Sequence, residues 1–161
     1  MKKKELLSDI VYVLLVVGLA LFIVTFIGQR VVVSGSSMEP YLSDGDMKIV
    51  NKVKYRFSEP ERFDVIVFPN PNDTSSFLIK RIIGLPGETI QIRKGTIYIN
   101  GEVLHEDYGL EVMRDEGIAL EKINIGTGEY FVLGDNRNNS LDSRNMTIGL
   151  ISKENIIGRV K

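Results

Sequence analysis

Hydrophobic residues are distributed very differently in the first thirty positions and in the rest of the chain. Residues 10–28 read IVYVLLVVGLALFIVTFIG and contain no charged side chain. As a helix rising about 1.5 Å per residue, this segment is roughly 28 Å long, close to the hydrocarbon thickness of a bilayer. Lys2, Lys3 and Lys4 precede it, and the positive-inside rule then places the amino terminus in the cytoplasm. The pattern predicts a cytoplasmic tail over residues 1–9 and one transmembrane helix over residues 10–28.

Two other interpretations of this segment stay open at this stage. A cleaved signal peptide also begins with basic residues, but its apolar region is usually about 7–15 residues long and ends in a small-residue cleavage site. Here the apolar run is longer and is followed by Gln29, Arg30 and three valines, without a clear site of that kind. A buried helix of a soluble domain is the second alternative, although few such helices are apolar on every face.

After residue 28 the pattern is that of a mainly β domain, over residues 29–161. Most apolar clusters are short, β-branched and bounded by Gly, Pro, Asn or Asp, as strands are. The stretch TIQIRKGTIYINGEVL alternates around Lys94-Gly95 and Asn100-Gly101, which predicts a three-strand meander with tight turns. Residues from about 100 to 128 are charged and less regular, and we interpret them as an insertion or rim. The predicted strands are 30–34, 47–53, 63–68, 77–83, 89–93, 96–99, 129–133 and 155–160.

Composition excludes several kinds of site. The absence of cysteine rules out disulfides, thiolate nucleophiles and cysteine-ligated metals. The one histidine, His105, leaves no multi-histidine metal centre and no Ser-His-Asp triad unless His105 serves it, and we interpret it as a surface residue. The net charge of −1 argues against a broad nucleic-acid-binding surface. We therefore expect no metal, no cofactor and no nucleic-acid partner.

The first candidate for chemistry is the segment S-G-S-S-M-E-P, residues 34–40. Its Ser and Gly content is equally typical of a flexible connector between a membrane and a domain. Met38 weakens the connector interpretation, because a large apolar side chain suits a loop that packs into a core. Pro40 disfavours the helical conformation at Glu39 and so restricts the chain path. A serine held at such a bend is a candidate nucleophile.

The second candidate is Lys80, which stands beside Arg81 in an otherwise apolar predicted strand, residues 77–83. A lysine on an edge strand commonly reaches into solvent and limits edge pairing. Alternatively, the apolar surroundings desolvate the Lys80 amine and lower its pKa, so that the neutral amine acts as a general base near neutral pH. A serine nucleophile in a chain with one histidine needs a base of this kind.

The third candidate is the polar segment G-D-N-R-N-N-S-L-D-S-R, residues 134–144, which follows an apolar strand. Such residues dominate solvated surface loops, which is the simpler interpretation. The acidic and basic residues of the segment are also suited to a charge-paired network that supports a neighbouring site. These residues are Asp135, Arg137, Asp142 and Arg144.

Together the three segments resemble bacterial type I signal peptidases, the membrane-bound Ser/Lys proteases that remove signal peptides. Residues 37–40 match the nucleophile motif S-M-x-P, and residues 62–68 are similar to the strand R-G-D-V-V-V-F. Residues 80–88 match K-R-V-I-G-x-P-G-D, and residues 134–144 match G-D-N-R-x-x-S-x-D-S-R without a mismatch. The four blocks follow in order behind a single N-terminal apolar segment, as in the Gram-positive type.

The resemblance implies a role for each matching residue. Ser37 is then the nucleophile and Lys80 the general base, and Ser140 hydrogen-bonds and orients the lysine amine. Some relatives carry a Ser or Thr at the position of Gly35 that joins the oxyanion hole; with Gly35 the hole relies on backbone amides, chiefly that of Ser37. The remaining matched residues are structural supports: Met38, Pro40, Asp135, Asp142 and Arg144.

The resemblance also implies the fold, the substrates and the location. The fold is an extracytoplasmic domain of packed antiparallel β-sheets, shared in part with the self-cleaving repressors of the SOS response. The substrates are secreted preproteins with small residues before the cleavage site, and the partner surface is membrane lipid. The implied location is the cell membrane, single-pass, with the catalytic domain outside.

Two departures and two other functions accompany this interpretation. Phe63 stands where the family strand usually has Gly, and Gly149 comes later after Arg144 than the usual spacing. A signal-peptidase-like factor for surface pilus assembly, catalytic on a pilin or acting as a non-catalytic chaperone, is the alternative function. A self-cleaving transcriptional repressor is disfavoured by the apolar segment and by the lack of a helix-turn-helix pattern.

Overall fold

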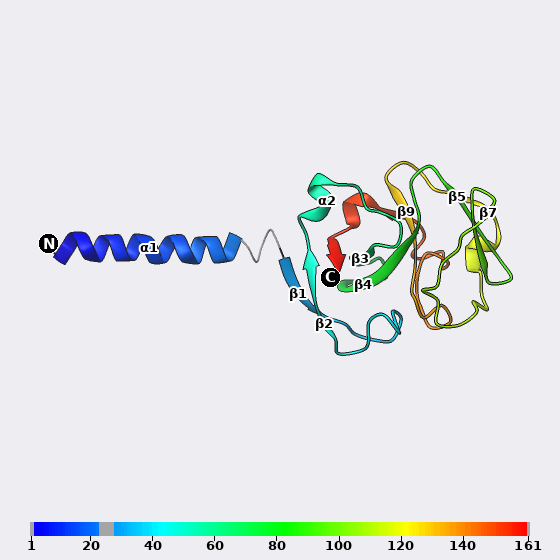
Figure 1. The fold of residues 1–161 in the computed structure, drawn as a ribbon, viewed down its shortest axis with the longest axis horizontal. Coiled ribbons are helices and arrows are strands. Elements are labelled where there is room, and N and C mark those ends of the chain that lie inside the picture. Colours follow the sequence, from blue (N-terminus) through cyan, green and yellow to red (C-terminus); the bar gives the residue numbers. More distant parts are fainter. Residues whose placement is uncertain (1, 23–27, 161) are drawn as a thin grey trace.

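The computed structural model describes residues 2–22 and 28–160 (Figure 1). Helix α1, Lys2–Phe22, extends away from the β-strands at the N-terminal end of the chain (Figure 1). Across these two ranges, no helix is long and apolar enough to cross a membrane. The predicted transmembrane helix over residues 10–28 includes residues 23–27, which lie outside the described residues.

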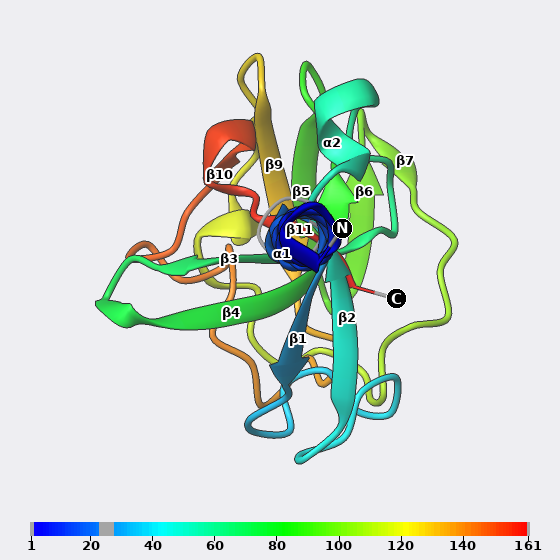
Figure 2. The same cartoon turned by 90° about the vertical axis from the view of Figure 1, so that its left-hand side faces the viewer.

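The first of two antiparallel sheets in the described residues has seven strands, in the order β1-β2-β11-β3-β4-β9-β10. Its long hairpin of β3 and β4 projects to one side in Figure 2. The short helices α2 (Lys54–Phe57) and η3 (Lys153–Asn155) lie between its strands along the chain. The strand bounds are β1 Gly28–Val32, β2 Met47–Asn51, β3 Val65–Asn70, β4 Asp73–Gly84, β9 Glu129–Leu133, β10 Ile151–Ser152 and β11 Gly158–Val160.

The second sheet has four strands in the order β7-β6-β5-β8. It contains the predicted meander, because β5, β6 and β7 pair consecutively. The turn residues Lys94, Gly95, Asn100 and Gly101 all have positive φ, which two-residue hairpin turns of this type require. Helix η2, Gly117–Leu120, follows this meander. The strands are β5 Thr89–Arg93, β6 Thr96–Ile99, β7 Glu102–Val103 and β8 Ile123–Asn124.

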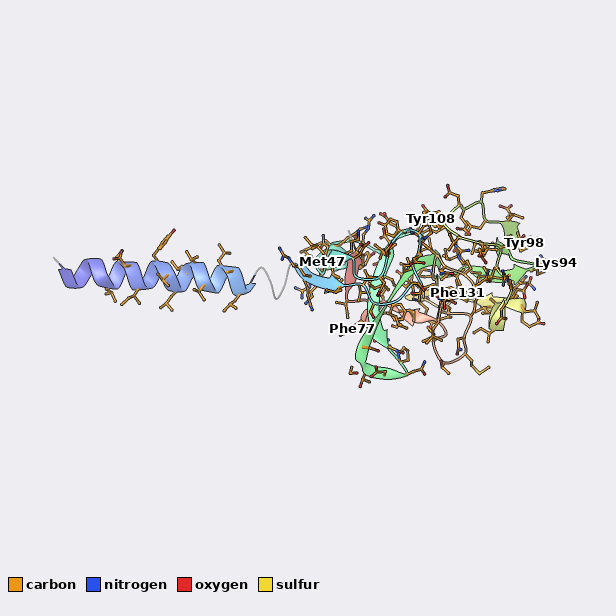
Figure 3. The ribbon with its side chains drawn as sticks, turned by 90° about the horizontal axis from the view of Figure 1, so that it is seen from below. Met47, Phe77, Lys94, Tyr98, Tyr108 and Phe131 are labelled. Carbon is orange, nitrogen blue, oxygen red and sulfur yellow. The ribbon has the colours of Figure 1, made fainter. Side chains whose placement is uncertain are left out.

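Apolar side chains fill the space between the two sheets. They also fill the space between the first sheet and the loop that follows β1. Between the sheets, Phe131 and Leu133 of β9 pack with Ile90 and Ile92 of β5 (Phe131 is labelled in Figure 3). A second cluster joins strands β2, β3 and β11 to the loop that follows β1. The prediction of a mainly β fold with packed antiparallel sheets is therefore confirmed.

Strand β4 changes its neighbours along its length. It pairs with β3 from Asp73 to Arg81, and with β9 from Arg81 onward. The second edge of residues 77–80 therefore has no strand partner among the described residues. Lys80 is nevertheless only 2% exposed, so the interpretation in which its side chain reaches into solvent is wrong.

Candidate active site

Residues 34–42 carry the candidate nucleophile Ser37, and we call them the nucleophile loop. They form a bent segment anchored in the core and not a flexible connector. Met38 and Leu42 are each 1% exposed and pack against strands β2 and β3. The Leu42 amide donates to Met38 O at 2.9 Å, and the Glu39-Pro40 peptide is cis. At the start of the loop Gly35 has a φ of 89°, and its amide donates to Asp44 Oδ1 at 2.8 Å. This packing fixes the position of Ser37 at the bend.

The structure brings Ser37 and Lys80 into direct contact. The Lys80 amine donates to Ser37 Oγ at 2.7 Å and to Ile79 O at 2.9 Å. Strand β4 supplies Lys80, and Ser37 and Met38 of the nucleophile loop line the same cleft as this part of the strand. The distance is within the range at which a base exchanges a proton with a nucleophile.

The surroundings of Lys80 favour its neutral form. Burial lowers the pKa of the Lys80 amine from 10.5 to about 8, because the charged form loses its hydration. The carboxylates of Asp142 and Asp135 act in the opposite direction and raise this pKa, but they do not outweigh burial. The prediction that apolar surroundings desolvate Lys80 is confirmed, and a substantial fraction of the amine is neutral near pH 8.

The polar segment 134–144 lies beside Ser37 and Lys80, the candidate dyad, and is held there by buried ion pairs. Arg144 donates to both carboxylate oxygens of Asp142, at 2.8 and 2.9 Å, and Asp142 also accepts the amide of Gly134 at 3.1 Å. Asp135, which is 1% exposed, pairs with Arg81 of β4, and Arg137 pairs with Glu106. The segment is a support and not an idle loop, but two of these three ion pairs are with residues outside it.

Ser140 differs from the role that the family resemblance implies. Its hydroxyl oxygen is buried and has no hydrogen-bond partner in the structure. The Lys80 amine donates to Ser37 and Ile79 instead, so the implied Lys80–Ser140 hydrogen bond is not formed here. Gly134 explains how Ser140 comes near the site: a Cβ at Gly134 would lie 2.2 Å from Ser140 Oγ and 2.5 Å from Ser37 O. Only glycine permits that approach.

Sequence analysis missed two asparagines that hold the nucleophile loop. The Asn136 amide donates to Ser37 O at 3.1 Å, and its side chain donates to Ser36 O at 3.2 Å. Asn139 donates to Ser36 Oγ at 2.8 Å. Both residues lie within the matched block G-D-N-R-x-x-S, but their residue types alone gave no reason to connect them with residues a hundred positions earlier. Their hydrogen bonds tie the loop to the segment 134–144.

A cleft of about 360 Å³ opens at the dyad. One wall is residues 31–34, at the end of β1, and the other is residues 76–80 of β4. β1 is the outermost strand of its sheet, and β4 lacks a second neighbour at these residues, so both walls present strand edges. In the part of the chain that the structure describes, no cluster of His, Asp or Glu side chains is arranged to hold a metal ion. His105 is exposed and lies outside this cleft.

Comparisons with known proteins identify the family of the chain. Residues 6–161 match the family described as "Signal peptidase, peptidase S26". The chain is 38% identical over 160 residues to signal peptidase I of Bacillus amyloliquefaciens, covering 92% of this chain and 80% of the relative. It is also 38% identical to the probable signal peptidase I-2 of Synechocystis, covering 88% of this chain and 65% of that relative, less than two thirds of its length.

A solved structure supports the same relationship. The crystal structure of a signal peptidase I from Enterococcus faecalis matches with a TM-score of 0.52 and 35% sequence identity. The match covers 65% of this chain and 98% of that one. With the family match over nearly the full length and these relatives, the chain belongs to the signal peptidase family, peptidase S26.

Proposed function

We propose that this chain is a signal peptidase I, a serine endopeptidase that removes signal peptides with Ser37 as nucleophile and Lys80 as general base. The contact of 2.7 Å between Lys80 Nζ and Ser37 Oγ carries the proposal. The depressed pKa of Lys80 and family membership support it. A general base is most effective when its pKa lies near the working pH, and burial brings this lysine into that range.

In the proposed reaction the neutral Lys80 amine takes the proton of Ser37 as Ser37 Oγ attacks the scissile carbonyl carbon. The tetrahedral oxyanion is stabilised by backbone amides, chiefly that of Ser37. The Lys80 ammonium then gives its proton to the leaving amine, and the peptide bond breaks to leave an acyl-enzyme. A water that loses its proton to Lys80 attacks the carbonyl carbon of the ester. The Lys80 ammonium returns this proton to Ser37 Oγ as the ester bond breaks, and the signal peptide is released.

The supporting residues hold these two groups in place. Asp142 with Arg144, and Asp135 with Arg81, fix the segment 134–144 against the dyad. We propose that Ser140 orients the Lys80 amine when the substrate is bound, because its buried hydroxyl lacks a partner in the free protein. A hydroxyl without a partner is available to accept a hydrogen bond from the ammonium form of Lys80.

The substrate would bind as an added strand in the cleft. The edges of β1 and β4 that form its walls offer main-chain hydrogen bonds to an extended peptide, which gives affinity with little dependence on sequence. Apolar side chains line the walls, among them Val33, Met38 and Ile79. Small residues before the cleavage site would fit the limited volume of this cleft, and preproteins with such residues are the proposed substrates.

We further propose that the N-terminal segment anchors the enzyme in the membrane, with the tail inside and the peptidase domain outside. Helix α1 exposes large apolar side chains along its length, including Leu14, Leu15 and Leu19, each 60% exposed or more. An apolar surface of this size is unfavourable in water and favourable in lipid. Anchoring would hold the enzyme and the membrane-inserted signal peptide on one surface.

A labelled preprotein with small residues before its cleavage site tests this function. The purified full-length protein is expected to release the signal peptide at that site, as mass spectrometry of both products would show. Ser37→Ala removes the attacking oxygen, so no product is expected, whereas Ser43→Ala removes an exposed hydroxyl outside the cleft and leaves cleavage in place. Equal cleavage by Ser37→Ala and the wild type would refute the proposal.

The pilus-specific alternative receives no support from these observations. The relatives described above are named as signal peptidases I, and their names mention no pilin. A non-catalytic chaperone has no need of a buried lysine in contact with a serine. Retention of both residues in contact favours a peptidase.

A further inference from the structure

Two tyrosine rings lie against the guanidinium of Arg81, the residue next to Lys80 in β4. Arg81 Cζ is 4.8 Å from the ring centroid of Tyr41 and 3.8 Å from that of Tyr108. A cation within about 6 Å of an aromatic face is attracted by the ring quadrupole. Arg81 is only 4% exposed, so water screens this attraction little. The guanidinium also donates to Asp135 at 2.8 and 2.6 Å and to Phe63 O at 3.0 Å, which holds it in one orientation.

The first ring belongs to the nucleophile loop. Tyr41 follows Ser37 by four residues, and its contact with Arg81 joins this loop directly to the strand that carries Lys80. Met38 and Leu42 of the same loop are buried in the core, but Tyr41 is 51% exposed. Burial of apolar surface therefore explains little of its position, and the contact with Arg81 is the interaction that does.

The second ring comes from the irregular region that we interpreted as a rim. Tyr108 contacts both Arg81 and Phe63. The ring centroids of Phe63 and Tyr108 are 5.0 Å apart. Phe63 has a φ of 71°, a left-handed conformation that side chains with a Cβ adopt at a cost. The ring of Phe63 is thus in contact with Tyr108 at a position whose backbone conformation is strained.

Arg81 reaches the nucleophile loop by a second route as well. It pairs with Asp135, and the amide of the following residue, Asn136, donates to Ser37 O at 3.1 Å. One arginine beside the general base is thus connected to Ser37 through Tyr41 on one side and through residues 135–136 on the other. Loss of the Tyr41 or the Tyr108 ring that packs on Arg81 is expected to loosen both connections.

We propose that Tyr41 and Tyr108 are positioning residues for the reaction: through Arg81 they hold the nucleophile loop against β4 and so maintain the contact between Ser37 and Lys80. The proposal rests on the Ser37–Lys80 function proposed above. It assigns to these tyrosines no contact with the reacting atoms. Their effect is on the distance between the two groups that react.

The test compares Tyr41→Leu with a matched loss of a ring elsewhere. The ring centroid of Tyr98 lies 4.3 Å from Arg93 Cζ in the second sheet. Tyr98 is at the end of the domain away from Met47 (Figure 3). Tyr41→Leu in the full-length protein is expected to lower kcat by about tenfold with KM unchanged, because small displacements of reacting groups are costly. Tyr41→Phe keeps the ring and is expected to restore kcat. Tyr98→Leu is expected to leave kcat as in the wild type.

A second measurement does not depend on cleavage. The Lys80 amine is titrated directly by NMR in isotopically labelled protein. Asp142 and Asp135 are the charged groups that act on it, and Asp135 is itself paired with Arg81. A loosened loop admits water, so Tyr41→Leu is expected to move the pKa of Lys80 upward, and Tyr98→Leu is not. Tyr108→Leu is expected to behave as Tyr41→Leu does, and it replaces that variant if Tyr41→Leu fails to fold.

The outcomes separate this proposal from the proposed function. A kcat and a Lys80 titration in Tyr41→Leu that both equal those of Tyr98→Leu would overturn the positioning role. Cleavage by Ser37→Ala would instead refute the dyad, and the titration would still decide whether Tyr41 controls the surroundings of Lys80.

Discussion

At the scale of single residues, the proposed chemistry depends on a lysine whose charged form is disfavoured by burial. Lys80 is buried, and its amine has a serine hydroxyl as its neighbour. The sequence motifs were sufficient to predict Ser37 and Lys80 as partners, since both stand in blocks that resemble a known family. The partners of Arg81 were not predictable in this way. Asp135 is 54 positions away, and only the folded sheet brings the two together.

The pKa of Lys80 predicts the pH dependence of the reaction. Lys80 must be neutral to act as a base, and its pKa is lowered to about 8 in the free protein. We expect kcat/KM to rise with pH along an acid limb with a midpoint near that value, because the amine is protonated and inactive below it. A pH series with a peptide substrate measures this limb. A midpoint near the ordinary lysine value would contradict the account.

Gly134 offers a test of the close packing behind the dyad. Gly134→Ala places a Cβ against Ser140 Oγ and Ser37 O, at distances that no side chain tolerates. We expect the free energy of unfolding to fall by about 1–3 kcal/mol, as overpacking does, and kcat to fall as well. Gly28→Ala is the control, since its Cβ would meet Ile49 at an ordinary 3.5 Å. Denaturant unfolding and kcat of both variants check the prediction, and equal behaviour would contradict it.

At the scale of elements, alternation of apolar and polar residues predicted three strands with their bounds. The bounds 89–93, 96–99 and 129–133 agree with β5, β6 and β9. The predicted strands 30–34, 63–68 and 77–83 differ from the observed β1, β3 and β4, and β4 begins four residues earlier than predicted. Strands β8 and β10 have two residues each, too few for any periodicity, whereas β7, which is equally short, was predicted from the Asn100-Gly101 turn that precedes it. The predicted strand 155–160 begins only at Gly158, because η3 occupies residues up to Asn155. What periodicity cannot supply is the pairing order, and the free edge of β4 that forms the cleft follows from that order.

Asp64 connects α2 to strands β3 and β11 and makes the pairing of these elements testable. Its carboxylate accepts from Lys54 at 2.9 Å, from the Tyr55 hydroxyl at 2.9 Å and from Arg159 at 3.0 Å. Burial alone would raise the pKa of Asp64, but the hydrogen bonds from Lys54, Tyr55 and the Glu61 amide outweigh it, and the pKa is lowered. The carboxylate therefore stabilises the fold above its unfolded-state pKa of about 3.9, and this stabilisation is lost as pH falls through the lower folded value.

We expect Asp64→Asn to reduce the free energy of unfolding at pH 7 by about 1.5–3 kcal/mol, the range for hydrogen bonds to charged groups. The difference from the wild type should shrink in acid, where the wild-type carboxyl is also neutral. Urea unfolding at neutral and acidic pH measures both effects. Asp73→Asn, which alters an exposed carboxylate bonded to Ser75 of its own turn, is the control. A difference from the wild type that does not change with pH would contradict the assignment.

At the scale of the whole molecule, the hydrophobic content of 43% and the net charge of −1 are averages over two unlike parts. Helix α1 is apolar over most of its length, and the β-strands that follow carry most of the charged residues. The apolar residues of the N-terminal segment predicted a membrane anchor, which remains a prediction. A tether of this kind acts through effective concentration and requires no contact with the dyad.

The anchor can be tested by removing it. A variant without residues 1–27 keeps all the strands and is expected to cleave a short soluble peptide as the full chain does. On a preprotein inserted in vesicles with the enzyme, we expect its rate to fall by at least about tenfold, since tethering commonly raises effective association by about 10²–10⁴. Thermal unfolding of both forms controls for stability. Equal rates on the vesicle substrate would show that the segment does not serve as an anchor.

The central claim is that the Lys80 amine is the base that activates Ser37, and kcat/KM of Lys80→Ala on a preprotein tests it most directly. Lys122→Ala, at an exposed position, is the matched control and is expected to retain wild-type activity. For Lys80→Ala we predict a loss of about 10²–10⁴-fold or more, the contribution typical of a general base, with the melting temperature maintained. Lys80→Ala with kcat/KM close to that of Lys122→Ala would contradict the claim.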